Sequence, residues 1–396
     1  MAATVIYLLG SYPVWSETFL RQDLSLLQAA GVPLCPLSLF PGDTAPQPDW
    51  PRVECLTPGG APGGAPTGRS RGRLWGCLPA RCREAWSLGS HRGLRRALAS
   101  AAREVGAVHI HAEFADLPGL LAAAAARDCG LSYSLGLHAR DVHQPKYRLG
   151  AMLGGARFVT VCNAAAYEAA RAACPAAAAL HLIPHGIDLA AWPFLEAPFA
   201  PGPPLRLLYA GRLVEKKGVD TLLQALAILA REGLPCHLAL AGDGPLGPSL
   251  KALAADLGIA ASLDWLGVLT HDGVRQALSQ ADALVAPSRV GRDGDRDGVP
   301  NVLLEAMARG VPVVGTSVGG LGEVLDEDTG WVVPPDAPAA LAAALQGLTT
   351  PATTVAAAET RRRAARDRLE ARYDARRLAT QRAALFEAVL ENHRGG

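Results

Sequence analysis

Short apolar runs alternate along the chain with longer alanine-rich segments whose apolar residues recur at helical spacing. This alternation predicts an α/β fold, because parallel buried strands have to be joined by crossover helices. The apolar runs end in glycine, serine or a polar turn, at the sheet edge where open α/β folds bind ligands. The expected strands are residues 5–10, 108–112, 133–138, 158–162 and 180–186, followed by 205–211, 237–242, 263–267, 283–288, 311–316 and 330–334.

A proline-rich passage at 193–204 separates the two series of strands. We therefore expect two Rossmann-like parallel-sheet domains, residues 1–195 and 196–370, which face each other across a cleft that holds the active site. The last helical stretch, 357–391, is expected to cross back to the first domain within 371–396. Residues 58–72 are rich in glycine and proline, which predicts a mobile loop.

The composition excludes several classes of protein. The chain is 49% hydrophobic, so it can form large cores, and its formal net charge of +1 gives no field that would attract nucleic acid. Its eight cysteines include no C-x-x-C pair, which indicates a reducing compartment. The N-terminus resembles a first strand more than a signal peptide, and no segment approaches the roughly 20 apolar residues that span a bilayer. We expect a cytoplasmic protein that at most lies on the inner face of the cytoplasmic membrane.

Residues 69–106 combine many arginines with Trp75, Trp86 and several leucines. Arginine and tryptophan in amphipathic order suit an anionic membrane surface. The alternative is a helical hairpin that packs on the N-terminal domain, with a solvated charged face and the tryptophans in its core. The sequence leaves both alternatives open.

An acidic, glycine-rich loop leads into a short helix between residues 287 and 323. Gly298 and Pro300 break the chain, and Pro300 suits the first turn of a helix over 301–309, whose free N–H groups would face the loop. Asp297 lies before this turn and Glu305 on the helix. Carboxylates accept hydrogen bonds from sugar hydroxyls, and a helix amino end suits phosphate. The loop therefore predicts a site for a phosphorylated sugar, with a solvated surface turn as the alternative.

A basic turn follows the first strand of the second domain, in GRLVEKKGVD at 211–220. Arg212 and Lys217 are placed to converge on a diphosphate, the arginine through its two-pronged guanidinium and the lysine as a point charge. A solvated helix start is the alternative. Together with the acidic loop, the basic turn predicts the second half of a site for a nucleotide diphosphate sugar.

The segment AGDGPLG satisfies G-x-G-x-x-G at Gly242, Gly244 and Gly247, with Asp264 about 20 residues further on. A dinucleotide site is therefore an alternative, and an NAD-dependent oxidoreductase with it. Two prolines stiffen the loop and a single match is a weak signal. The same glycines would also let the backbone approach a nucleotide closely.

Three further places in the first half carry candidate chemistry. Ser16, Glu17 and Thr18 follow the first strand and are placed to cap a helix. His109, His111 and Glu113 alternate at a strand end, as metal ligands can, but no fourth ligand has metal-site spacing, so we expect no metal. His138 ends another strand, beside Arg140 and Asp141, and is placed to face the cleft.

Nearly the whole chain resembles the family-4 retaining glycosyltransferases of the GT-B fold, and in particular their colanic acid and exopolysaccharide branch. The resemblance rests on YPVWSETFLRQ (12–22), IHAEF (110–114), LHARDV (137–142), IPHGIDLAAW (183–192), AGRLVEKKG (210–218), LAGDGP (240–245), WLG (265–267) and DGVPNVLLEAMARGVPVVGT (297–316). It implies transfer of a hexose from a UDP- or GDP-linked donor to a saccharide acceptor, lipid-linked in this branch, without a cofactor or metal.

The resemblance also implies residue roles. Arg212 and Lys217 would hold the donor diphosphate, Glu305 the ribose, and Asp297 the donor hexose, while His138 would stand beside the reacting carbon. Further donor contacts are expected from Gly10, Ser11, Gly211, Gly242, Asp243, Gly244, Leu266, Gly298, Val299, Pro300 and Asn301. Acceptor contacts are expected from Glu17, His111, Glu113 and Asp141.

Two positions depart from the family pattern. Asp297 stands where the family has glutamate, one methylene longer, and Glu113 stands where this branch more often has a second histidine. We therefore keep two alternatives beside sugar transfer. One is a nucleotide-sugar epimerase or phosphorylase of the same fold, and the other is a catalytically silent protein that binds nucleotide sugars.

Overall fold

The computed structural model describes residues 3–14, 17–47, 50–57, 79–175, 179–197, 199–349 and 352–394. The chain divides into two compact units. Unit 1 comprises Met1–Gly186 and Ala375–Gly396, and unit 2 comprises Ile187–Asp374. The loop expected at 58–72 lies outside the described residues.

The chain passes between the units earlier than the proline-rich passage suggested. The change comes after Gly186 rather than after residue 195, and the return comes at Ala375 rather than at 371. The physical reason is that Ile187 and Trp192 are already buried in a core of unit 2. Ile187 also donates a backbone hydrogen bond to Tyr373 O (2.8 Å), so the outgoing and returning segments are paired in unit 2.

Unit 1 contains a seven-stranded parallel sheet in the order β3-β2-β1-β4-β5-β6-β7. Two of these strands, β2 and β3, were not expected from the sequence: β2 contains Pro36, which cannot donate to a ladder, and β3 has two residues. The strands are β1 (Thr4–Tyr12), β2 (Leu34–Pro41), β3 (Glu54–Cys55), β4 (Ala107–Glu113), β5 (Ser132–Leu137), β6 (Val159–Val161) and β7 (Leu180–Leu182).

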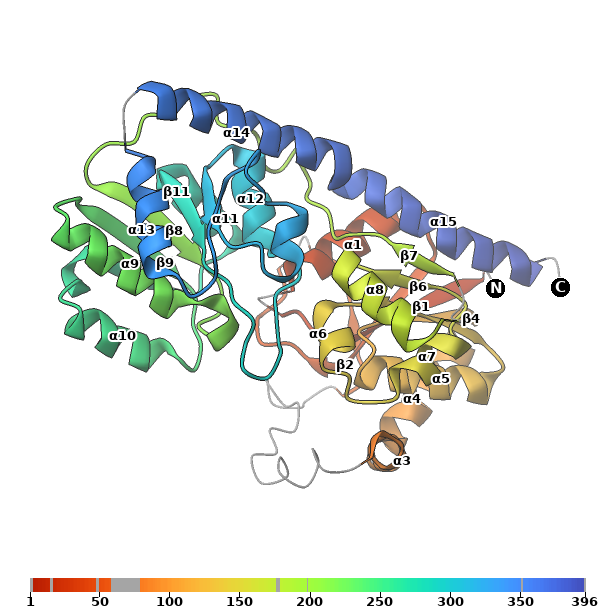
Figure 1. The fold of residues 1–396 in the computed structure, drawn as a ribbon. Helices are drawn as coiled ribbons and strands as arrows, with labels where there is room; N and C mark the ends of the chain where they lie inside the picture. Colours follow the sequence, from red (N-terminus) through yellow and green to blue (C-terminus); the bar gives the residue numbers. More distant parts are fainter. Residues whose placement is uncertain are drawn as a thin grey trace. The chain divides into compact units, whose positions relative to one another are not determined.

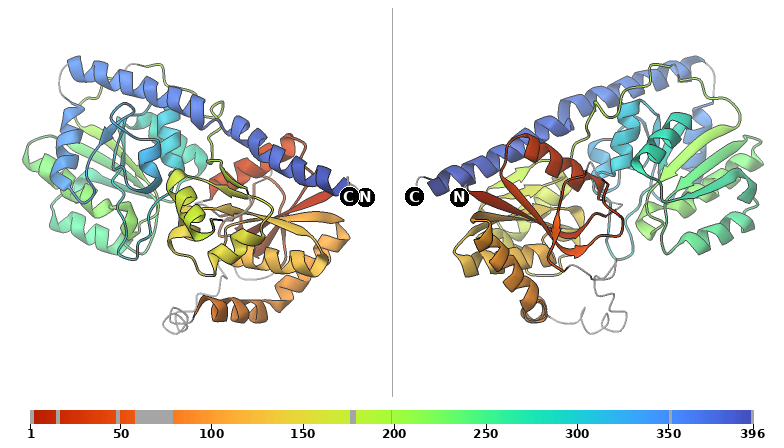
Figure 2. Two further views of the ribbon diagram at one scale, coloured as in Figure 1. Left: turned by 45° about the vertical axis from the view of Figure 1, so that its right-hand side comes forward. Right: turned by 180° about the vertical axis from the view of Figure 1, so that it is seen from behind.

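Helices cover both faces of this sheet (Figure 2). Because strand side chains alternate between faces, Val5, Tyr7 and Leu9 pack against α1 and α15, whereas Ile6 and Leu8 pack against α4 and α5. The helices of unit 1 are α1 (Thr18–Ala29), α3 (Ala80–Ser90), α4 (Arg92–Glu104), α5 (Leu117–Cys129), α6 (Ala139–His143), α7 (Leu149–Gly155), α8 (Ala164–Ala173) and α15 (Ala375–Arg394).

The arginine-rich segment forms the hairpin α3 and α4 over its described part. Leu94, Leu98 and Ala102 of α4 are buried in the core of unit 1. Trp86 of α3 is 43% exposed, so it is not the core residue that the hairpin alternative predicted. Trp75 lies outside the described residues. The apolar side of α4 thus packs on the sheet, while Trp86 stays on the surface.

Unit 2 contains a six-stranded parallel sheet in the order β10-β9-β8-β11-β12-β13, with helices on both faces (Figure 1). Its strands are β8 (Leu205–Ala210), β9 (Cys236–Ala241), β10 (Leu263–Gly267), β11 (Ala283–Ala286), β12 (Val313–Gly315) and β13 (Trp331–Val332). Its α-helices are α9 (Val219–Arg231), α10 (Gly247–Asp256), α11 (His271–Gln280), α12 (Asn301–Arg309), α13 (Pro338–Gly347) and α14 (Ala352–Arg372). Three 3₁₀ turns complete it: Glu215–Lys217, Ala260–Ser262 and Gly319–Glu323.

The helical stretch expected at 357–391 is two helices. It breaks at Tyr373 and Asp374, where the chain pairs with Ile187. Ala365 and Leu369 of α14 are buried in unit 2, whereas Phe386 of α15 is buried in unit 1. The chain thus returns to unit 1 in α15, which begins at Ala375 where 371 was expected.

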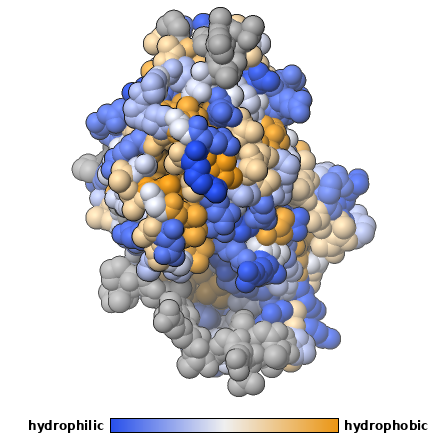
Figure 3. Space-filling view, turned by 60° about the vertical axis from the view of Figure 1, so that its left-hand side comes forward, coloured by the Kyte–Doolittle hydropathy of each residue, from blue (hydrophilic) through white to orange (hydrophobic). Residues whose placement is uncertain are grey.

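Within the described part of the chain, no helix is both long and apolar enough to cross a bilayer. On the face drawn in Figure 3, hydrophilic and hydrophobic residues are interspersed.

Candidate functional site

The basic turn of unit 2 begins where β8 ends. Gly218 closes the turn with φ +61°, and a side chain at this position would collide with the carbonyl of Pro287. Glycine is therefore required both by the backbone conformation and by the close approach of the loop that follows β11. Because β8 and β11 are neighbours in the sheet, the basic turn and the acidic loop meet at one edge.

Asp297 is the centre of the contact between the turn and the loop. Lys217 Nζ lies 2.8 Å from its Oδ2, Lys216 Nζ lies 3.5 Å from its Oδ1, and the Ser288 hydroxyl donates to Oδ2 at 2.9 Å. Burial alone would raise the pKa of Asp297, but the two lysines outweigh it and lower that pKa below its ordinary value. This carboxylate is 7% exposed. It holds Lys217 and Lys216 in place, and the expected contact with the donor hexose stays a prediction.

Arg212 differs from the two lysines because its guanidinium is exposed. Of the residues the structure describes, none forms an ion pair or hydrogen bond with this side chain. Its backbone carbonyl is fixed by the Tyr209 hydroxyl, which donates to it at 2.9 Å. The turn therefore carries two different cations: Arg212 is unpaired, and Lys217 is held in position by Asp297.

The loop from Asp297 to Pro300 rests on a glycine pair. A side chain on Gly319 would collide with the carbonyl of Asp297, and one on Gly320 would lie 2.8 Å from Val299 N. Gly320 N donates to Asp297 O at 3.0 Å. Pro300 is the residue before α12 rather than part of its first turn. The backbone of 298–301 is thus held at the amino end of α12, where N–H groups favour an anion.

Glu305 lies one turn into α12 and is 8% exposed. Among the described residues its carboxylate accepts no hydrogen bond, and its nearest charged neighbour is His271, whose Nε2 is 3.8 Å from Oε1. Burial raises the pKa of Glu305 to about 7. A buried carboxylate with unused acceptor capacity is expected to bind hydroxyl groups of a ligand.

The raised pKa of Glu305 predicts a pH-dependent stability. The folded state binds the Glu305 proton more tightly than the unfolded state, whose pKa is near 4.5. The stabilisation is therefore complete below pH 4.5 and lost as pH rises through about 7. Between these limits the unfolding free energy of the wild type should fall by about 3 kcal/mol relative to that of Glu305→Gln. Urea unfolding midpoints against pH check this, with exposed Glu232→Gln as the control; parallel curves for wild type and Glu305→Gln would refute it.

The glycines of AGDGP are explained by contacts within unit 2. A side chain on Gly242, with φ +138°, or on Gly244 would collide with the backbone of Gly211 or Leu213. Leu213 N donates to Asp243 O at 2.9 Å, which joins this loop to the basic turn. Leu266, at the end of β10, is 42% exposed at the same sheet edge. The AGDGP loop therefore borders the basic turn, and its expected contact with a donor stays a prediction.

The structure weakens the dinucleotide alternative. Asp264 would have to lie at the carboxyl end of its strand to reach a ribose. Instead it pairs with Ala239 in the sheet, three residues before the end of β10, and its carboxylate accepts from His237 Nε2 at 2.8 Å. The acidic partner of the glycine motif is thus engaged away from the ligand edge.

Unit 1 contains a buried network around Glu113, at the end of β4. The Tyr7 hydroxyl donates to Oε1 at 2.5 Å, and His138 Nε2 lies 2.9 Å from Oε2. His111 Nε2 lies 3.5 Å from Oε1. Burial would raise the pKa of Glu113, but the hydrogen bonds of His111 and His138 outweigh it and hold that pKa well below its ordinary value. For His138, burial would lower the pKa, but hydrogen bonds with Cys162 and Glu113 raise it well above its ordinary value.

The expected acceptor contacts of His111 and Glu113 are therefore corrected. Both side chains are about 2% exposed, and their polar atoms bind other residues of unit 1. His109 likewise uses both ring nitrogens on Ser132 and Ser134, each at 2.7 Å, and His111 Nδ1 lies 2.8 Å from Ser134 Oγ. Glu113 thus contacts His138 directly, while His109 and His111 are held by serines of β5.

Gly136 provides the space for the Glu113 carboxylate. A Cβ at this position would lie 2.7 Å from Glu113 Cδ and closer still to Oε2. Gly136→Ala should therefore displace the carboxylate and lower the unfolding free energy by about 1–3 kcal/mol. Gly93→Ala, in open space on α4, is the matched control and should be neutral or stabilising by up to about 1 kcal/mol. Equal melting temperatures for the two variants would contradict the role of Gly136.

The other predicted residues of unit 1 occupy strand and helix ends. Gly10 and Ser11 lie inside β1, which continues to Tyr12 by pairing with β2, rather than in a turn after it. Glu17 precedes α1 without a side-chain cap, and burial raises its pKa to about 7; Ser16 lies outside the described residues. Asp141 Oδ2 accepts from His138 N at 2.9 Å, and burial raises its pKa to about 7.

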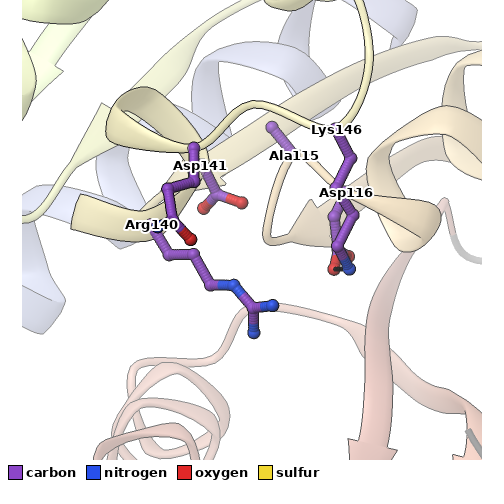
Figure 4. A pocket seen from close by; sticks show the side chains of 6 residues that line it. Ala115, Asp116, Arg140, Asp141 and Lys146 are labelled. Atoms are coloured by element: carbon purple, nitrogen blue, oxygen red, sulfur yellow. Dashed lines mark hydrogen bonds and ion pairs between the residues drawn. The ribbon is translucent and has the colours of Figure 1, made fainter. Parts of the chain in front are cut away.

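Asp141 also lines a small polar pocket in unit 1 (Figure 4). Arg140 and Asp141 of α6 lie on one side of it, and Asp116 and Lys146, joined by an ion pair of 2.6 Å, lie on the other. Charges of both signs around one pocket suit a ligand with many hydroxyl groups.

Sequence reasoning assigned no role to three side chains that lie beside these sites. Lys216 helps to hold Asp297. His185 Nδ1 lies 2.9 Å from Asp23 Oδ2, and the Cys162 thiol hydrogen-bonds His138. Their only signal in the sequence was position, since Cys162 and His185 lie at the ends of expected strands and Lys216 lies in the basic motif.

Comparison with known proteins agrees with this geometry. Residues 204–350 match the family described as glycosyl transferases group 1. The chain is 32% identical over 191 residues to the putative colanic acid biosynthesis glycosyltransferase WcaL of Escherichia coli, over 48% of this chain and 47% of the relative. The matched region thus spans about half of each protein.

Two solved structures share the fold of the whole chain. They are sucrose-phosphate synthase of Thermosynechococcus elongatus, with a TM-score of 0.73 and 22% identity, and HepE of Anabaena in complex with UDP and glucose, with a TM-score of 0.71 and 18% identity. Each match covers 98% of this chain and 100% of the other. The two parallel sheets are therefore the two Rossmann-like domains of a GT-B fold, as expected.

Proposed function

We propose that this chain, whose residues 204–350 form a glycosyltransferase group 1 domain within a GT-B fold, transfers a hexose from a nucleotide diphosphate sugar to a saccharide acceptor with retention of the anomeric configuration. The observation that carries the proposal is in unit 2. An unpaired Arg212, a fixed Lys217 and the amino end of α12 are at one sheet edge with the buried carboxylate of Glu305, which accepts no hydrogen bond from the described residues. This is the set of groups that a diphosphate and a ribose require.

In this proposal each part of the donor has its own partner. Arg212 and Lys217 bind the diphosphate, the backbone from Gly298 to Asn301 binds phosphate and sugar, and Glu305 accepts hydrogen bonds from the ribose hydroxyls. Leu266 offers an exposed apolar contact for the base. The loops around Gly211, Gly242, Asp243 and Gly244 border the same donor.

The proposed reaction breaks the bond between the anomeric carbon and the phosphate oxygen, and its electron pair leaves with the nucleotide diphosphate. The acceptor hydroxyl bonds to the same carbon from the face that the nucleotide leaves, and its proton passes to the departing phosphate oxygen. Arg212, Lys217 and the amino end of α12 stabilise the charge that develops there. Cations and a helix amino end can supply this stabilisation without a metal.

The acceptor is assigned to unit 1, at Glu17 and the polar pocket that contains Asp141. The WcaL relative is named for colanic acid biosynthesis, which supports a saccharide acceptor in exopolysaccharide synthesis, lipid-linked at the cytoplasmic face of the membrane. Trp86 is exposed on an arginine-rich hairpin, which supports peripheral contact with an anionic membrane surface.

A thermal-shift panel of UDP-, GDP- and ADP-sugars beside NADH tests the proposal. A ligand at 100 times its dissociation constant adds about 2.7 kcal/mol of stability. One class of nucleotide sugar should raise the melting temperature and NADH should not, while UDP, present in the HepE structure, is the first nucleotide to try. Stabilisation by NADH alone would overturn the proposal. Binding without transfer to any saccharide would favour the silent binding protein, and release of free or isomerised sugar would favour a phosphorylase or epimerase.

A further inference from the structure

Three neighbouring strands of unit 1 end in residues that can bind a metal. His138 follows β5, Cys162 follows β6 and His185 lies shortly after β7. One ligand atom from each of the three lies within 4.8 Å of those of the other two. The three strands are adjacent and parallel, so their carboxyl ends lie at the same edge of the sheet. We propose that His138, Cys162 and His185 form a binding site for a thiolate-binding divalent metal, of which Zn²⁺ fits best.

Both imidazole rings are supported by a buried carboxylate, as in known metal sites. Glu113 Oε2 lies 2.9 Å from His138 Nε2, and Asp23 Oδ2 lies 2.9 Å from His185 Nδ1. Such carboxylates fix the orientation and tautomer of a ligating histidine. This pairing on two rings of one cluster distinguishes it from a chance group of polar residues.

The second ring carries an unused lone pair. His185 Nδ1 has two contacts, Asp23 Oδ2 at 2.9 Å and Arg382 Nη2 at 3.3 Å, and because the carboxylate oxygen is the closer one we place the hydrogen of His185 on Nδ1 and the lone pair on Nε2. His185 Nε2 is buried and has no hydrogen-bond partner among the described residues. A buried nitrogen that can only accept is costly without a partner, and a metal ion is one partner that satisfies it.

The charges around the cluster also accommodate a divalent ion. A small cavity is lined by Glu113, His138, Cys162, His185 and Arg382, among others. Arg382 Nη1 lies 2.7 Å from Asp23 Oδ1, so Asp23 has a cationic partner and Glu113 supplies a further negative charge.

Two imidazoles and one thiolate select the class of metal. Magnesium and calcium prefer oxygen ligands, whereas zinc binds nitrogen and sulfur and keeps a fourth position open when the protein supplies three ligands. Zinc–ligand bonds are about 2.0–2.3 Å long. The side chains must therefore draw closer on binding, which should raise the stability of unit 1.

Titration of the full-length protein with Co²⁺ and without donor tests the site. We expect one equivalent to produce a thiolate-to-cobalt charge-transfer band and the visible bands of a tetrahedral site. Zn²⁺ should abolish them, Mg²⁺ should not, and Zn²⁺ should raise the melting temperature. Cys162→Ser should lose the charge-transfer band and at least tenfold in affinity, and His185→Gln should lose the same affinity. Cys174→Ser, another partly buried cysteine of unit 1, should behave as wild type.

Two results would overturn the inference: no charge-transfer band with the wild type, or the same band and affinity in both folded variants. Circular dichroism identifies a variant that fails to fold. In that case the band and affinity of the other variant test the metal site. The test needs no sugar donor. Failure of the metal site would therefore leave the proposed transfer intact, and absence of transfer would leave the metal site intact.

Discussion

Arg212→Ala and Lys217→Ala are each expected to lower kcat/KM for sugar transfer about 100-fold, which corresponds to about 3 kcal/mol of barrier. The reason is that both cations are assigned to the negative charge on the departing nucleotide. That charge is largest in the transition state, so the loss should appear mainly in kcat.

The two variants should differ in a second respect. Arg212 has no partner in the described structure and is exposed, so its removal should leave the melting temperature unchanged. Lys217 lies 2.8 Å from the buried Asp297, so its removal should also destabilise unit 2. Arg363→Ala, an exposed arginine of α14 paired with Glu359, is the control and should keep full activity. Steady-state kinetics with the donor found by thermal shift check these expectations, and wild-type turnover in both variants would refute the assigned roles.

Asp297→Asn is expected to have the second large effect, on stability and activity together. It leaves Lys217 and Lys216, whose side chains are 15% and 12% exposed, without their central counter-charge. Removal of one partner from a buried ion pair costs about 3–5 kcal/mol. Because Lys217 would lose its fixed position, kcat/KM should fall at least as far as in Lys217→Ala.

Asp295→Asn is the matched control for Asp297→Asn. Asp295 lies in the same loop and pairs with Lys216 at 3.0 Å, but it is more exposed and does not contact Lys217. It should lower the melting temperature by less and leave kcat nearly unchanged. Calorimetric melting and steady-state kinetics of the two variants check this, and equal effects of both substitutions would mean that Asp297 has no special role.

The sequence predicted the architecture well because the apolar runs of a parallel sheet are nearly continuous. It predicted α12 correctly, since Pro300 and Gly310 bound it. It missed β2, because Pro36 argues against a strand, and it placed the start of the C-terminal helix at 371 rather than at Ala375, because only the pairing with Ile187 marks the break. Contacts between distant segments determine both features, and a linear pattern does not contain them.

The candidate site shows the same limit. The basic turn and the acidic loop were found from residue type and strand ends. The role of Asp297 in holding Lys217 was not found in this way. The two residues are 80 positions apart, and they meet because β8 and β11 are neighbours in the sheet. Likewise, Glu113 was expected to bind an acceptor, whereas its neighbours are Tyr7 of β1 and His138, which follows β5.

The most direct test of the account is a crystal structure of the protein with the donor that stabilises it most. We predict the diphosphate within hydrogen-bond distance of Arg212 and Lys217, and the ribose hydroxyls at the Glu305 carboxylate. A donor bound elsewhere, or a diphosphate that contacts neither Arg212 nor Lys217, would contradict the account.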